Sequence, residues 1–157
     1  MSRSMLVAGG GDRGHFLELK CVPTSTLKGE IDDFIAAGTT VIGKFVSLSF
    51  GANYEVDSPA AGAQVDGKIH AVKEDKVNDT YELTCRIWSF TDDQSNRYPA
   101  ICIVQGPYSG TLVRRNTAEC YSGSTFYQFS DGDTTARGNA VIAIDVPASG
   151  YCDVIMG

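Results

Sequence analysis

The segment YELTCRIWSF, residues 81–90, carries the strongest secondary-structure pattern in the chain. Apolar side chains occupy positions 81, 83, 85 and 87, and polar side chains occupy positions 82, 84 and 86. Because successive residues of a β-strand point to opposite faces, this alternation predicts a strand with one face in the core and one in solvent. Trp88 and Phe90 then fall on the polar face, which predicts that the end of this strand is covered on both sides.

Short strand patterns recur on either side of this segment, separated by clusters of Gly, Pro, Asn, Asp and Ser. A helix is favoured only for one or two turns over Glu30–Ala37, before Gly38. The fold class we predict is therefore all-β, a small β-barrel or sandwich. The expected strands are Val41–Leu48, Tyr54–Val56, Lys68–Val72, Thr80–Phe90, Ala100–Val104, Thr111–Arg115, Thr125–Phe129, Asn139–Asp145 and Tyr151–Met156.

The second half of the chain echoes the first when Gly38 is aligned with Gly110. Six of the 35 positions from 38 to 72 are then identical without a gap. Apolar positions also coincide, since Ile69 aligns with Val141. Chance similarity is the alternative, but we favour two related β-modules, which as two half-barrels closing on each other would hide many strand edges.

The segment before Gly29 differs in character from the rest of the chain. Gly9–Gly14 is glycine-rich, and Val22–Thr26 reads as extended chain. We therefore divide the chain into an extended N-terminal arm, residues 1–28, and a β-barrel or sandwich domain, residues 29–157. The candidate partner-binding residues are apolar residues of the arm and one basic pair: Leu6, Val7, Phe16, Leu17, Leu19, Arg114 and Arg115. The sequence equally allows the basic pair to lie on a solvated strand.

Composition excludes several classes of function. The net charge is −6 and the 13 basic residues are scattered, whereas nucleic-acid-binding proteins usually concentrate Lys and Arg on one face. No apolar run approaches the ~20 residues that span a bilayer, so we expect no membrane segment and no nucleic-acid partner. The five cysteines lack C-x-x-C spacing, which favours reduced thiols buried in strands over a zinc site or a disulfide framework.

No set of residues capable of catalysis assembles from the sequence, and we expect no enzyme, no cofactor and no metal. The glycines of residues 9–14 match G-x-G-x-x-G by letters but do not open a helix within a βαβ unit. Of the two histidines, His70 shares its parity with polar strand positions and is expected to face outward. The carboxylate clusters at Asp92–Asp93 and Asp131–Asp133 fit hairpin turns better than calcium loops or a hydrolase site.

A family resemblance is carried by residues from the middle and the end of the chain. The runs Ala36–Val41, Gly43–Val46, Tyr54–Val56 and Pro59–Ala63, and then the ending Val141–Val154, resemble the small decoration (cement) proteins on the heads of tailed bacteriophages. The resemblance covers roughly residues 36–156 and lies in the rhythm of strands and turns, not in an invariant motif. Residues before 29 have no counterpart in it.

The resemblance implies a structural virion protein that binds the outer surface of a phage capsid shell and stabilises it. The implied partners are the major capsid protein with the HK97 fold and other copies of the chain in a homotrimer or another homo-oligomer. The implied location is the capsid surface, after synthesis in the bacterial cytoplasm. The alternative function is a carbohydrate-binding or receptor-binding β-module, as in a tail fibre, with Tyr121 or Tyr127 as stacking residues.

Overall fold

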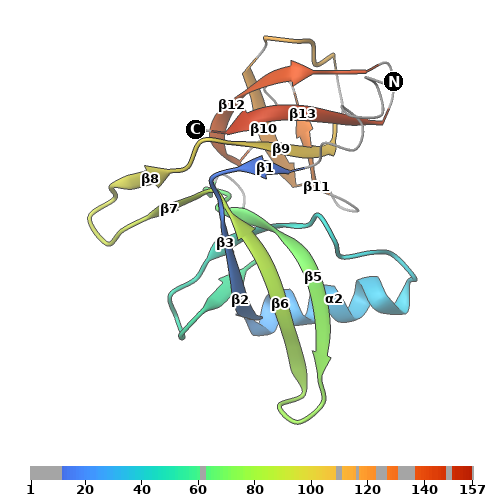
Figure 1. The fold of residues 1–157 in the computed structure, drawn as a ribbon. Coiled ribbons are helices and arrows are strands. Elements are labelled where there is room, and N and C mark those ends of the chain that lie inside the picture. The colour runs from blue at the N-terminus through green and yellow to red at the C-terminus, as the bar shows by residue number, and fades with distance from the viewer. Residues whose placement is uncertain are drawn as a thin grey trace.

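The computed structural model describes residues 12–60, 63–108, 111–115, 117–122, 127–130, 137–147 and 150–156, and these form a mostly β protein with a single α-helix. The helix, α2, spans Ser25–Ala36. The strands are β1 (Arg13–Gly14), β2 (Leu17–Pro23), β3 (Phe45–Leu48), β4 (Glu55–Asp57), β5 (Gly67–Asp75), β6 (Thr80–Ile87), β7 (Ser89–Thr91), β8 (Arg97–Pro99), β9 (Cys102–Pro107), β10 (Thr117–Ser122), β11 (Tyr127–Ser130), β12 (Arg137–Asp145) and β13 (Tyr151–Met156). The predicted all-β fold built on a small barrel is confirmed (Figure 1).

Residues 17–87 form a closed barrel with the strand order β2-β4-β3-β5-β6, which we call module 1. Strand β6 lies between β2 and β5 and pairs antiparallel with both. Its alternation follows the sequence, because Leu83 and Cys85 are fully buried while Glu82 is exposed. The barrel is closed by β2, which pairs in parallel with β4 on its other side.

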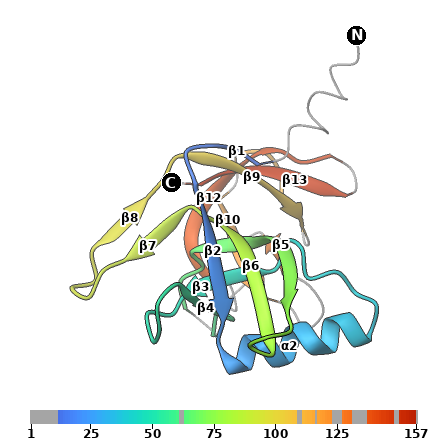
Figure 2. The same cartoon turned by 60° about the horizontal axis from the view of Figure 1, so that its bottom comes forward.

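Helix α2 lies across one end of the module 1 barrel (Figure 2). The Thr24 side chain caps it by accepting a hydrogen bond from the backbone N–H of Leu27 at 3.2 Å. Leu27 and Ile31 are one helical turn apart, so they share one helix face, and both are fully buried in the barrel core. The helix is thus longer than the one or two turns predicted from Glu30, because the cap at Thr24 makes it begin at Ser25.

The second half of the chain forms module 2, whose sheet has the order β1-β9-β13-β12-β10-β11. Strands β9, β10, β11, β12 and β13 repeat the antiparallel pairings of β2, β3, β4, β5 and β6, respectively. The parallel contact that closes module 1 between β2 and β4 also has a counterpart, a parallel bridge from Tyr108, just after β9, to Phe129 in β11. The two modules therefore share one topology, as the sequence echo predicts. The predicted closure of two half-barrels on each other is wrong, because the module 1 barrel closes through its own strands.

The alignment of Gly38 with Gly110 also matches the bounds of four of the five strand pairs. Shifted by this alignment, β3 and β4 fall within β10 and β11, and β5 and β6 cover most of β12 and β13. The fifth pair differs, because β2 starts at Leu17 and β3 only at Phe45, whereas β9 starts at Cys102 and β10 already at Thr117. The extra length in module 1 is close to the 12 residues of α2, which has no counterpart among the described residues between β9 and β10.

The division of the chain at residue 28 is wrong for the described part of the proposed arm. Strand β2 is an integral barrel strand that aligns with β6 from Leu17 to Cys21, and the chain then passes directly into α2. The physical reason is closure, since without β2 both β4 and β6 would keep an unpaired edge. Residues 1–11 lie outside the described part of the chain.

The predicted strand Thr111–Arg115 is also wrong. This segment forms bends and a turn, in which Leu112 is buried in the core of module 2. Arg115 has a φ of 72° and donates its backbone N–H to the carbonyl of Ala143 at 2.7 Å. A left-handed residue in a turn breaks the strand conformation, although the neighbouring Val113 gives the segment a strand-like composition.

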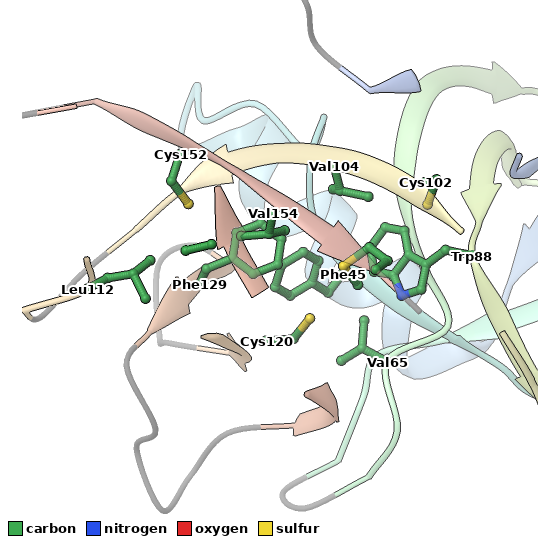
Figure 3. Close-up of a cluster of buried hydrophobic side chains, with 12 residues drawn as sticks. Phe45, Val65, Trp88, Cys102, Val104, Leu112, Cys120, Phe129, Cys152 and Val154 are labelled. Atoms are coloured by element: carbon green, nitrogen blue, oxygen red, sulfur yellow. The ribbon is translucent and has the colours of Figure 1, made fainter. Parts of the chain in front are cut away.

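The two modules share part of their cores. Phe45 of β3 and Trp88, which follows β6, extend from module 1 into the core of module 2 (Figure 3). The ring of Phe45 lies 5.4 Å from that of Phe129 and meets Trp88 edge-on at 6.0 Å between centroids. Such aromatic contacts stabilise packing beyond the buried area alone, so Phe45, Trp88 and Phe129 form an aromatic layer that the two modules share.

Candidate functional site

A buried ionic cluster lies where the two modules meet. The carboxylate of Asp12 lies 2.7 Å from the ammonium of Lys68 in β5 and 2.9 Å from the guanidinium of Arg86 in β6. It also accepts the backbone N–H of Gln105 in β9 at 2.9 Å. Asp12 therefore connects both modules through one side chain. We call Asp12, Lys68 and Arg86 the Asp12 cluster.

The electrostatics of the Asp12 cluster favour the charged carboxylate. Burial alone would raise the pKa of Asp12, but Lys68 and the hydrogen bonds from Gln105 and Arg86 outweigh it and hold the pKa below its usual value. The guanidinium of Arg86 also lies 5.1 Å from the centre of the Phe16 ring and 3.1 Å from Nε2 of His70. The Nε of Arg86 is buried, and no described residue accepts its hydrogen bond.

A groove of about 530 Å³ opens above this cluster, along the junction of the modules. Its polar lining includes the Asp12 cluster, His70 and Gln105. Its apolar lining comes from both modules, with Phe34, Ile42 and Phe45 on one side and Pro107 and Tyr151 on the other. The groove thus combines a basic floor with apolar walls, and sequence reasoning missed it because its residues are spread from position 12 to position 151.

Lys44 lies at the module 1 side of the groove but is almost completely buried. Burial lowers the pKa of its ammonium to about 8, although Glu30 and Asp57 act in the opposite direction. The ammonium lies 3.5 Å from the Glu30 carboxylate and donates to the hydroxyl of Ser58. Its charge is therefore neutralised within module 1, and it anchors α2 to the barrel.

A second buried carboxylate, Asp66, lies at the entrance to β5. Burial raises its pKa to about 6, while hydrogen bonds from the Leu48 backbone and the Gln64 side chain lower it in part. Its own backbone carbonyl accepts the N–H of Trp88 at 2.8 Å. These contacts tie β3, β5 and the junction together, so Asp66 has a structural role.

The outward face of the module 2 sheet carries a cross-strand row of isoleucines. Ile142 of β12 pairs with Ile155 of β13, which pairs in turn with Ile103 of β9, so the three side chains lie side by side. Ile142 is 51% exposed and Ile155 is 36% exposed, whereas the neighbouring Val154 faces inward and is fully buried. We call these three residues the isoleucine row. A solvent-facing sheet surface is usually polar, so the row indicates a contact surface.

Comparison with known proteins gives no relative for this arrangement. No family model, no curated protein and no solved structure matches the chain.

The candidate partner-binding residues that the structure describes do not form one surface. Leu17 is exposed on β2, whereas Leu19 packs against the core of module 1 and Phe16 against that of module 2. Arg114 and Arg115 are exposed in the turn that precedes β10. Leu6 and Val7 lie outside the described residues.

The cysteines, His70 and the Asp92 turn lie as the sequence predicts. All five cysteines are buried free thiols, as predicted. His70 is exposed on β5, also as predicted. Asp92 accepts backbone hydrogen bonds from Gln94 and Asn96, which confirms the turn between β7 and β8. Asp131–Asp133 lies outside the described residues.

The described part of the chain also has no group of His, Cys, Asp and Glu side chains placed to hold a metal ion. Its helix is too short and too polar to cross a membrane. Tyr121 and Tyr127, the candidate stacking residues, lie in the paired strands β10 and β11. Their side chains are outside what the structure describes.

Proposed function

We propose that the chain is a structural virion protein that binds the outer surface of a phage capsid shell and stabilises it. The observation that supports this proposal most directly is the isoleucine row. A surface protein that acts by contact needs an apolar area on a stiff support, and the row lies on a sheet whose opposite face is the core of module 2. The shared aromatic layer adds stiffness, because it joins the two modules.

The chain has only 157 residues, so a single copy would bind the capsid shell weakly. Many copies on one particle would add their contributions through multivalency, especially if each binds as a homotrimer or another homo-oligomer. The shell partner proposed is the major capsid protein with the HK97 fold. Isoleucine suits such a contact surface, since β-branched residues stabilise strands and offer rigid apolar contacts.

Co-sedimentation of the purified chain with bare phage capsids tests this function. We expect the chain to pellet with capsids, and Ile142→Lys to weaken pelleting because it places a charge in the isoleucine row. Val77→Lys is the matched control, since Val77 is 93% exposed at the tip of the β5–β6 turn. A wild-type chain that stays in the supernatant at all concentrations would reject the proposed function.

Glycan binding is the outcome that would favour the alternative, a carbohydrate-binding or receptor-binding module. A screen of the wild-type chain against immobilised bacterial polysaccharides would detect it, and Tyr127→Ala would then be expected to abolish the signal. If Tyr127→Ala lost glycan binding without losing thermal stability, sugar recognition would replace capsid decoration as the proposed function.

A further inference from the structure

The groove at the junction of the modules has the properties of a binding site distinct from the isoleucine row. We propose that it binds a protein segment in which a carboxylate side chain is flanked by apolar side chains. This inference goes beyond the proposed function and does not depend on it, because the partner is defined by its chemistry and not by the particle to which it belongs.

The charge of the groove floor supports a carboxylate ligand. Lys68 and Arg86 both bind the single carboxylate of Asp12, so one positive charge in the cluster is not compensated there. His70 lines the same groove beside Arg86 and brings no negative charge that would offset it. The whole chain carries a net charge of −6, so a basic floor is a local departure from its overall electrostatics.

The hydrogen-bonding capacity of the floor supports the same ligand. One terminal nitrogen of the Arg86 guanidinium donates a hydrogen bond to Asp12, and the other lies beside Nε2 of His70. Arg86 lines the groove and keeps 20% of its side-chain surface in contact with solvent. A guanidinium binds carboxylates through parallel N–H groups, so a carboxylate in the groove can pair with the exposed edge of this side chain.

The apolar residues that line the groove indicate that its ligand is a peptide and not a small metabolite. Pockets for small molecules bury most of the surface of the ligand, and their walls are largely enclosed before the ligand binds. Here Ile42 of module 1 and Tyr151 of module 2 both line the groove and remain 49% and 59% exposed. Exposed isoleucine and tyrosine beside a basic floor match a segment with alternating apolar and acidic side chains, in which each kind of side chain has its own contact.

Direct binding of a model peptide tests the inference. The probe is a fluorescein-labelled octapeptide of alternating leucine and glutamate, titrated with the full chain and followed by fluorescence anisotropy. We expect saturable binding that weakens as salt is raised, because the contact between carboxylate and guanidinium is screened. The same peptide with glutamine in place of glutamate should bind at least about tenfold more weakly.

Two substitutions at exposed positions locate the binding without disturbing the core. Ile42→Glu places a carboxylate on the wall and should weaken binding of the acidic peptide at least about tenfold through repulsion and lost apolar contact. His70→Glu should weaken it to a similar extent, because the new carboxylate can pair with Arg86 and so occupy the ligand position from within. Val77→Glu adds the same charge far from the groove lining and should leave the affinity unchanged.

Three outcomes would overturn the inference. The first is no binding of the acidic peptide at millimolar protein, and the second is equal affinity for the glutamine peptide. The third is equal affinity in Ile42→Glu and the wild-type chain while both show the same thermal stability. Each outcome can occur whether or not the chain pellets with capsids, so failure of this inference is distinguishable from failure of the proposed function.

Discussion

Replacing Asp12 by asparagine should strongly destabilise the protein, because it removes the carboxylate that binds both Lys68 and Arg86. Removing one partner from a buried ion pair costs about 3–5 kcal/mol, because the remaining charge stays buried without compensation. Here Lys68 and Arg86 keep 13% and 20% of their side-chain surface in contact with solvent, so water can stabilise part of their charge. We therefore expect the free energy of unfolding to fall by about 2–4 kcal/mol.

Urea unfolding followed by the fluorescence of Trp88 measures this change, because Trp88 is the single tryptophan of the chain and is buried at the junction. The corresponding fall in the melting temperature is about 5–15 °C, from about 2–4 °C per kcal/mol for a chain of this size. Asp93→Asn, in the exposed turn between β7 and β8, is the control and should change stability by less than about 0.5 kcal/mol.

The pH dependence gives a second readout of the same reasoning. The pKa of Asp12 is lowered in the folded protein, so its contribution is present above the unfolded carboxyl value of about 3.9 and disappears as the pH falls through the lower folded value. The difference between the wild-type chain and Asp12→Asn should be constant from pH 7 to about pH 5 and shrink below about pH 4. An Asp12→Asn variant as stable as the wild type at pH 7 would refute the role of the Asp12 cluster in joining the modules.

Three further changes have defined expectations. The pKa of Asp66 is raised to about 6, so its ionisation above that pH costs stability, and wild-type stability relative to Asp66→Asn should fall by up to about 3 kcal/mol between pH 4 and pH 7, as followed by urea unfolding at each pH. Gly106→Ala would place a methyl group 2.9 Å from the Phe129 ring and should cost about 1–3 kcal/mol in thermal unfolding; an unchanged melting temperature would contradict the packing described. Gly29→Ala, in the middle of α2 with open space around it, should instead stabilise the protein by about 0.5–1 kcal/mol in the same assay, and a loss of stability would contradict the assigned helix.

The parts of the fold that could be predicted from sequence are those determined by local alternation and by repetition. The pattern of residues 81–90 predicted which side chains of β6 face the core, and the alignment of Gly38 with Gly110 predicted the equivalence of the two modules. The start of α2 was missed because Thr24 follows Pro23 and because Gly29 interrupts the helical composition. A capping side chain acts through one hydrogen bond, which a periodicity analysis does not detect.

The candidate site could not be predicted, for a different reason. Asp12 lies 56 residues from Lys68 and 74 residues from Arg86, and it appeared to belong to a flexible glycine-rich segment. Lys68 and Arg86 in turn occupy the faces of their strands that alternation assigns to solvent. Only the docking of module 2 against module 1 buries these faces, so charge pairing across the junction depends on tertiary structure that no local pattern contains.

The aromatic layer of Phe45, Trp88 and Phe129 also has a consequence for fragments of the chain. A fragment that ended after module 1 would leave Phe45 and Trp88 without the part of the core that module 2 supplies. Exposing such large apolar side chains to water is unfavourable, so the two modules should fold and unfold as one cooperative unit.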